Sequence, residues 1–261
     1  MRQVFLVLAL STIALLAPPP AHAKRLDRGE VITLLKRVQD AQHAAGDRSL
    51  GFVIFAKRRD GQNTTTEGVA YQRTESQRLV MLFTKPKTER GKGYIRYNKN
   101  LWFYDARLGK WERRTERARI AGSDANREDF DFPRYSEEYN GSHVRDVRLG
   151  RFHTHLIELH AKPKAVVAYV KVRIWIDSKS KMILKRQDFG TSGKLIRTLF
   201  KPSWKKYYSA SKKANVWWPE TVRIYDELIK GNYTVVKFTR SSFKRLPANL
   251  FTKAWLESKS R

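Results

Sequence analysis

The sequence predicts a mainly β protein (α+β), in which a curved antiparallel sheet forms an incomplete barrel covered by an N-terminal helix and a short helix/loop lid. From Leu50 onward, β-forming runs repeat apolar residues with a period of two, and turn residues such as those at 60–61 and 190–193 separate the runs. Short turns between consecutive strands favour an antiparallel meander. A long, twisted sheet of this kind buries its apolar face by curling, so we expect a concave apolar surface.

The segment at 169–177, YVKVRIWID, illustrates the period of two. Its even-numbered residues are all apolar and fall on one face of a strand, whereas Lys171, Arg173 and Trp175 fall on the other face. The pattern predicts a sheet with one apolar face and one basic face.

An amphipathic helix is expected before the first strand. Asp27 is followed three residues later by Glu30, the spacing of a capping box, and Gly46 can end the helix. Five apolar residues between these points recur at helical spacing: Val31, Leu34, Leu35, Val38 and Ala41. We expect this apolar face to pack against the sheet.

Two later segments lack the period of two. Residues 122–140 contain the helix-start residues Ser123, Asp124 and Asn126, which predict a loop and a short helix that interrupt the sheet. The tail, residues 246–261, has apolar residues near helical spacing. We expect the tail to cap one opening of the barrel.

The first 23 residues predict an export signal. Arg2 gives a basic start, an apolar run extends from Val4 to Ala17, and three prolines precede Ala21-His22-Ala23. This order is typical of a secretory signal peptide, so we expect cleavage after Ala23. The apolar run is also shorter than the roughly 20 residues that span a bilayer. The mature chain, residues 24–261, is expected to form a single domain.

The amino-acid composition limits the classes of molecule that this protein can bind. The chain has 53 Lys+Arg against 25 Asp+Glu, a net charge of +28, and no cysteine. Disulfides and thiolate metal sites are therefore excluded. The positive charge favours anionic partners, and for an exported protein the abundant polyanion is a membrane surface rather than nucleic acid. An exported polyanion-binding protein remains an alternative function.

Two segments superficially suggest metal sites. His153 and His155 fall on one face of a strand, but His160 falls on the opposite face, so surface histidines are the better interpretation. The residues from Asp124 alternate like a calcium loop, but Asp129 and Tyr135 stand where such a loop needs Gly and Glu. We expect no metal and no cofactor.

Catalytic motifs give no support for an enzyme. The chain has no G-x-S-x-G elbow, P-loop or dinucleotide fingerprint. Four carboxylates could approach one another in the fold and act on glycosidic bonds, although nothing singles out a pair: Asp105, Glu112, Asp124 and Asp129. A hydrolase of envelope glycans or lipids is therefore the weaker alternative, and we expect no catalytic residue.

Several segments resemble one known family. NLWFYD at 100–105 looks like the LWFY strand of periplasmic lipoprotein carriers of the LolA type, and 111–132 is similar to the signature of the related outer-membrane lipoprotein-sorting proteins. Residues 172–200 and 217–238 are similar to the downstream half of that family, so the resemblance spans most of residues 50–256. One departure is Ala106, where such carriers commonly have proline.

The resemblance implies a periplasmic carrier, not an enzyme, that shields acyl chains of a lipoprotein or lipid in a hydrophobic cavity during transport towards the outer membrane. It also implies an inner-membrane transporter and an outer-membrane acceptor as partners, while the charge favours an anionic membrane surface and no nucleic acid. The candidate cavity or lid residues are Trp102, Tyr104, Trp111, Arg113, Gly122, Ser123, Asp124, Asp129 and Phe130.

Overall fold

A computed structural model describes residues 25–43, 46–97, 100–115, 117–130, 134–210 and 212–260. The predicted export signal and its cleavage point lie outside these residues. Within the described ranges, no helix has the length and apolar character needed to cross a bilayer.

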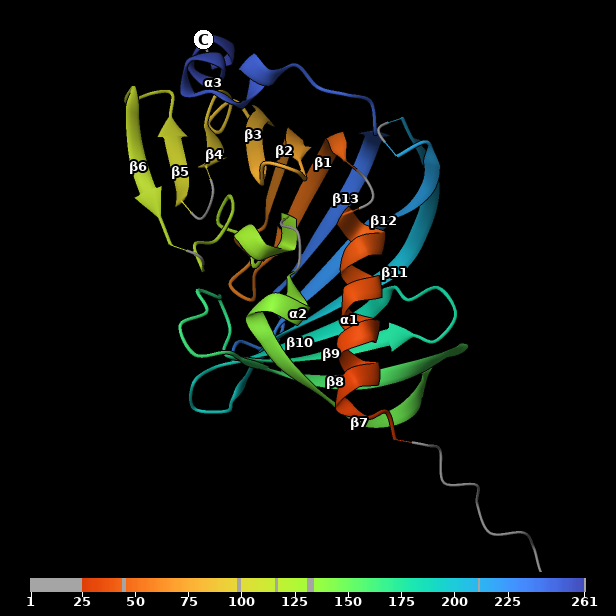
Figure 1. Cartoon of the computed structure of the whole chain (residues 1–261). Coiled ribbons are helices and arrows are strands. Elements are labelled where there is room, and N and C mark those ends of the chain that lie inside the picture. The colour runs from red at the N-terminus through yellow and green to blue at the C-terminus, as the bar shows by residue number, and fades with distance from the viewer. Residues whose placement is uncertain are drawn as a thin grey trace, which may run out of the picture.

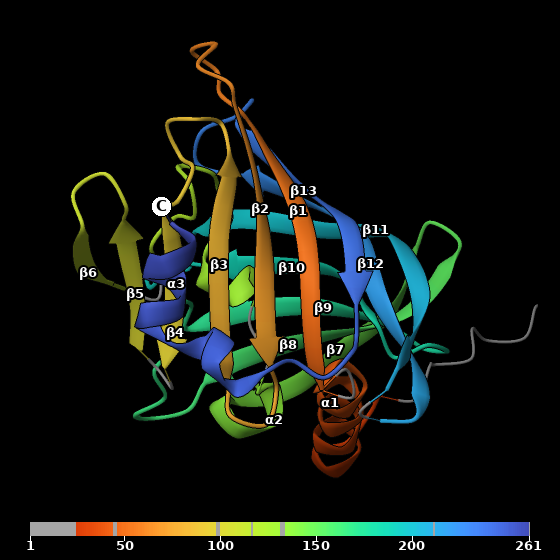
Figure 2. The same ribbon diagram turned by 90° about the horizontal axis from the view of Figure 1, so that it is seen from above.

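The described strands form one open antiparallel sheet in the order β6-β5-β4-β3-β2-β1-β13-β12-β11-β10-β9-β8-β7. The sheet curls strongly (Figure 1), and Figure 2 shows β7–β10 running across behind β1–β3 rather than continuing their plane. The strands are β1 Asp47–Lys57, β2 Thr64–Arg73, β3 Arg78–Lys85, β4 Gly93–Tyr97, β5 Asn100–Asp105, β6 Lys110–Arg114, β7 Tyr139–Leu149, β8 Phe152–Ala161, β9 Lys171–Asp177, β10 Ile183–Phe189, β11 Leu195–Ser209, β12 Ala214–Asp226 and β13 Tyr233–Ser242. The predicted incomplete barrel is confirmed.

The period of two sets which side chains face the inside of the curl. On β9, Val172, Ile174 and Ile176 are fully buried, whereas Arg173 and Trp175 between them are partly exposed. The same alternation holds on β1, where Phe52 and Ile54 point into the core. Apolar residues at every second position therefore line the concave face, as expected from the pleat of a strand.

The N-terminal helix α1, Arg28–His43, covers the concave face of β7–β10. The backbone N–H of Glu30 donates to Asp27 Oδ1 at 2.8 Å, and the N–H of Asp27 donates to Glu30 Oε2 at 2.8 Å. This reciprocal pair confirms the predicted capping box. The apolar face of α1 packs on Ile157, Ile174 and other buried residues of these strands.

The segment between β6 and β7 forms the predicted lid. It contains the short 3-10 helix η1, Arg127–Phe130, and the single turn α2, Tyr135–Glu138. Phe130 inserts into the concave core, with its ring centroid 5.9 Å from that of Phe52. The lid and α1 together cover the inside of the curled sheet.

The C-terminal tail forms η2, Ala248–Phe251, and α3, Lys253–Lys259, but it does not cap an opening of the barrel. Phe251 and Leu256 pack on Ile95 of β4, whereas the preceding Tyr94 belongs to the concave core. Neighbouring residues of a strand point to opposite faces, so α3 lies on the outer face of the sheet (Figure 2). That expectation was wrong because β3 and β4 carry apolar side chains on both faces, and the outer ones need their own cover.

Candidate functional site

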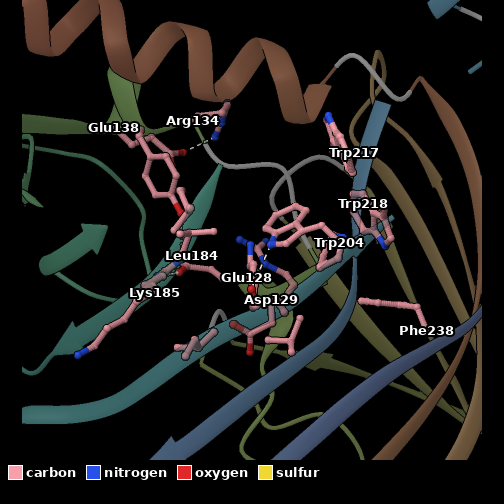
Figure 3. Close-up of a pocket in the computed structure, with 18 of the residues that line it drawn as sticks. Glu128, Asp129, Arg134, Glu138, Leu184, Lys185, Trp204, Trp217, Trp218 and Phe238 are labelled. Atoms are coloured by element: carbon pink, nitrogen blue, oxygen red, sulfur yellow. Dashed lines mark hydrogen bonds and ion pairs between the residues drawn. The ribbon is translucent and has the colours of Figure 1, made fainter. Parts of the chain in front are cut away.

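A pocket opens into the concave interior between the lid and the strands β10–β13 (Figure 3). The cavity has a volume of about 100 Å³. The pocket is therefore a narrow slot, and a long ligand enters it only if the lid or the wall side chains move.

One wall of the pocket is aromatic. Trp204 from β11, Trp217 and Trp218 from β12, and Phe238 from β13 contribute to it (Figure 3). The rings of Trp218 and Phe238 meet edge to face with centroids 5.8 Å apart, and Trp217 at the mouth is 45% exposed. Such a wall offers a large apolar area for a ligand at a small cost in side-chain entropy.

The floor of the pocket contains a buried network of paired charges. Arg197 of β11 reaches Asp188 Oδ2 through Nε at 2.7 Å and Asp129 Oδ2 through one terminal nitrogen at 2.8 Å. Arg186 of β10 reaches Asp188 Oδ1 and Glu128 Oε2, each at 2.5 Å. The network ties the lid helix η1 to the sheet.

Electrostatic pairing decides the pKa values in this network. Burial by itself would lower the pKa of Arg197, but the carboxylates of Asp129 and Asp188 outweigh burial and raise it. Burial would likewise raise the pKa of Glu128, but Arg186 and a backbone donor outweigh it and lower the pKa. Glu128 and Arg197 are therefore ionised at neutral pH.

Two other cations in the pocket show the opposite behaviour. Burial, followed by the positive charge of Arg186, lowers the pKa of Lys201 to about 8. Burial, followed by Arg127 and Arg134, lowers the pKa of Arg96 to about 9. The pocket thus adds positive charge to a poorly solvated space, which favours anionic groups.

The candidate residues of η1 and of the loop before it lie close to the pocket, and most of them stabilise the loop instead of lining the pocket. Asp124 Oδ2 accepts from Arg58 at 2.8 Å and from the hydroxyl of Thr234 at 2.9 Å. Ser123 Oγ donates to the carbonyl of Ile120 at 2.7 Å. Gly122 adopts a φ of +67°, which glycine tolerates without strain, and its carbonyl accepts from Arg58. Of this group of candidates, only Asp129 lines the pocket.

The candidate aromatic residues of β5 and β6 do not line this pocket. Trp102, Tyr104 and Trp111 pack beneath α3 on the outer face of the sheet. Lys253 lies over the rings of Trp102 and Trp111, 4.2 Å and 4.8 Å from their centroids. Trp111 also donates to Glu257 at 2.6 Å, so these residues hold the C-terminal helix.

Arg113, the remaining candidate, lies at the edge of the sheet. It is exposed on β6 and donates to Asn100 Oδ1 at 2.6 Å. The sequence placed these four residues in one motif, but the alternation of β5 and β6 directs the aromatic ones to the outer face. The sequence did not single out three residues that line the pocket: Trp204, Trp218 and Lys201. The available signal for the two aromatic residues was the clustering of tryptophans on the adjacent strands β11 and β12.

The histidine segment forms a cluster different from the one that spacing suggested. His155 is joined by His143 and Asp146 of β7, and one ligand atom from each lies within 4.8 Å of the others. Nδ1 of His143 accepts the backbone N–H of Leu26 at 3.0 Å, so Nε2 carries the proton and donates to Asp146 at 2.9 Å. A metal-binding histidine normally donates, rather than accepts, through its second nitrogen. These hydrogen bonds therefore hold the segment just before α1 against β7.

Comparisons with solved structures place the fold. A domain from Vibrio parahaemolyticus described as an outer membrane lipoprotein-sorting protein matches with a TM-score of 0.76 and 19% identity, over 87% of this chain and 97% of that one. A LolA superfamily protein from Nitrosomonas europaea matches with a TM-score of 0.72 and 16% identity, over 85% and 97%. A DUF1329 family protein from Desulfovibrio piger matches with a TM-score of 0.78 and 16% identity, over 88% and 98%.

A family model described as that of an uncharacterized protein matches residues 75–258, which is more than half of the chain. The chain belongs to the family that this model describes, and its fold is LolA-like. Among curated proteins, none matches the sequence. Within the LolA-like fold, the pocket described above lies on the concave face, beneath the covering helices.

Proposed function

We propose that this LolA-like protein is a periplasmic carrier that shields acyl chains of a lipid or lipoprotein in the concave pocket on the way to the outer membrane. The aromatic wall of Trp204, Trp218 and Phe238 beneath a separate lid carries this proposal. The name of the Vibrio protein, which mentions lipoprotein sorting, points to the same kind of cargo. Residues 24–261 would form the single carrier domain after cleavage at Ala23.

Binding, rather than catalysis, accounts for these side chains. The carboxylates at the floor, Asp129, Asp188 and Glu128, are all engaged by arginines at 2.8 Å or less. Carboxylates held in this way are poor general acids or bases. An apolar wall, by contrast, supplies about 0.8 kcal/mol for each buried CH₂ group of a chain.

The narrow width of the slot makes lid movement part of the proposed cycle. The lid helix η1 is fastened by ion pairs to β10 and β11, whereas the segment just before α1 is joined to β7 by the hydrogen bond that the backbone N–H of Leu26 donates to His143. An inner-membrane transporter and an outer-membrane acceptor would then load and unload the open form. The net charge of +28 would favour encounters with anionic membrane surfaces.

Native mass spectrometry of the mature protein, purified from an exporting host, tests the proposal. We expect co-purified or added acyl lipid at defined stoichiometry, and about tenfold weaker binding in Trp204→Ala because a large part of the apolar wall is lost. Trp111→Ala is the matched control, because Trp111 packs under α3 on the outer face. A protein that stays free of lipid when acyl lipids are supplied would overturn the proposal and leave polyanion binding as the leading function.

A further inference from the structure

Lys201 occupies an unusual position on the concave face. Arg197, Leu199 and Lys201 alternate along β11, so their side chains share the inner face of the strand. Leu199 is buried in the concave core, and Lys201 lines the pocket beside Trp204, with its ammonium 5.7 Å from the ring centroid. In the described part of the chain, no carboxylate lies within 4.0 Å of this ammonium.

A charged ammonium in this position is energetically unfavourable. Transfer of a charge from water to an apolar space is unfavourable unless an opposite charge or a set of acceptors compensates it. Arg197, four residues earlier on the same face, has two carboxylates at 2.7–2.8 Å. The pocket therefore leaves one cation uncompensated next to an aromatic wall, and an incoming anion would compensate it.

The other cations at the pocket are engaged by the protein. Arg134 pairs with Glu138 at 2.5 Å, and Arg96 donates to Gln77 at 3.3 Å. Lys185 points to the outer side of the sheet, with its ammonium 4.5 Å from the ring centroid of Trp175 (Figure 3). Lys201 is thus the cation best placed to meet a ligand that lies against Trp204.

We propose that the pocket takes a free amphiphile whose acyl chain ends in a single anionic group, a carboxylate or a phosphate, and that Lys201 binds this group while the chain lies along Trp204 and Trp218. This inference rests on the proposed carrier function and names its cargo class. An acyl chain joined to a lipoprotein through an ester or amide bond brings no anion to Lys201. The arrangement therefore favours a free lipid over a lipoprotein as cargo.

The test compares ligands of one chain length in the mature, full-length protein. Palmitate, hexadecyl phosphate and neutral hexadecanol are titrated below their aggregation concentrations while intrinsic tryptophan fluorescence is recorded at pH 7. We expect the anionic ligands to bind at least about tenfold more tightly than hexadecanol, because a hydrogen bond to a charged group is worth more than a neutral one. Stronger binding of palmitate or of the phosphate then identifies which head group fits.

Variants locate the effect. Lys201→Met keeps the length of the side chain and removes its charge, so the preference for anions should disappear while hexadecanol still binds. Lys237→Met removes the same charge at an exposed position of β13 outside the pocket lining, and it should keep the preference. Lys201→Gln provides a second variant of the same site if the methionine variant does not fold.

The outcomes separate the two proposals. Equal affinity of the wild type for palmitate, hexadecyl phosphate and hexadecanol would overturn the anionic cargo while supporting an acyl carrier. A preference that persists in Lys201→Met would also overturn the role of Lys201. Failure of all three ligands to bind would overturn the carrier function itself.

Discussion

Two cations on the inner face of β11 differ in almost every respect except position. Arg197 is buried between Asp188 and Asp129, and these carboxylates raise its pKa despite burial. Lys201, four residues along, faces the aromatic wall, and burial lowers its pKa to about 8. Burial is common to both sites, so the partner carboxylates alone decide whether the charge is stabilised.

The comparison separates architecture from function. The Arg197 site joins β10, β11 and the lid helix η1 through atoms that are already fully engaged. The Lys201 site keeps an unfavourable charge in a pocket that a ligand can enter. Natural proteins retain such local costs mainly at sites where a ligand offsets them.

The largest expected effect tests the architectural side. Asp188→Asn removes the carboxylate shared by Arg186 and Arg197, leaving two buried guanidinium groups without their common partner. We expect a loss of about 3–5 kcal/mol in the free energy of unfolding, measured by urea denaturation. Glu112→Gln is the control, because its pair with Arg114 is exposed and surface pairs contribute about 0–1 kcal/mol. A loss of similar size in both variants would contradict the assigned role.

The next effect has the opposite sign. Lys201→Met removes a poorly compensated charge, so the ligand-free protein should become more stable at pH 7. The shift of the lysine pKa from 10.5 to about 8 sets an upper limit near 3 kcal/mol at about 1.4 kcal/mol per pKa unit. Because the residue remains partly exposed, we expect about 1–2 kcal/mol in a urea titration. A destabilised variant would show that Lys201 has a structural role like that of Arg197.

The pH dependence of the same pair of proteins sharpens this result. Between about pH 8 and 10.5 the folded protein has released the Lys201 proton and the unfolded chain has kept it, so stability rises with pH in this window. The stabilising effect of Lys201→Met should therefore be fully present below pH 8 and vanish by about pH 10.5. Arg186 and Asp129 are the charged groups that act on this ammonium. The other charged groups lining the pocket are Arg96, Arg127, Glu128, Arg134, Glu138 and Lys185.

If the difference in stability between the wild type and Lys201→Met does not change with pH, the effect comes from packing rather than from the charge of Lys201. Measuring wild type and variant under identical conditions cancels the other lysines, including Lys185, whose pKa burial also lowers.

The smallest expected effect concerns helix α1, which covers the concave face, rather than the charged network at the floor of the pocket. Asp27→Ala removes half of the reciprocal cap of α1 and should cost about 1 kcal/mol. Hydrogen exchange should show faster exchange in the first turns of α1, with little change in β11. Asp40→Ala, at an exposed position of the same helix, is the matched control. Equal protection of α1 in both variants would mean that packing on β7–β10, and not the cap, fixes the helix.

Most of the fold could be predicted because local chemistry specifies it. The alternation around Ile174 and the capping box of Asp27 and Glu30 are properties of neighbouring residues, and both are present as expected. The lid around Phe130 was equally visible as a break in the period of two. The export signal remains a prediction of the sequence.

The site was harder to predict, because it depends on how far and in which direction the sheet curls. Alternation shows that Trp102 and Phe103 face opposite ways, but only the curl decides that the face of Trp102 is the outer one, covered by α3. Likewise, nothing within β11 distinguishes Arg197 from Lys201, since the carboxylates that pair with Arg197 come from η1 and β10. The sequence by itself determined the strands, the helix cap and the break that forms the lid, because these follow from interactions within a few residues. Only the tertiary structure decided which side chains line the pocket and which charges stay uncompensated, because both depend on contacts between segments that are distant in the chain.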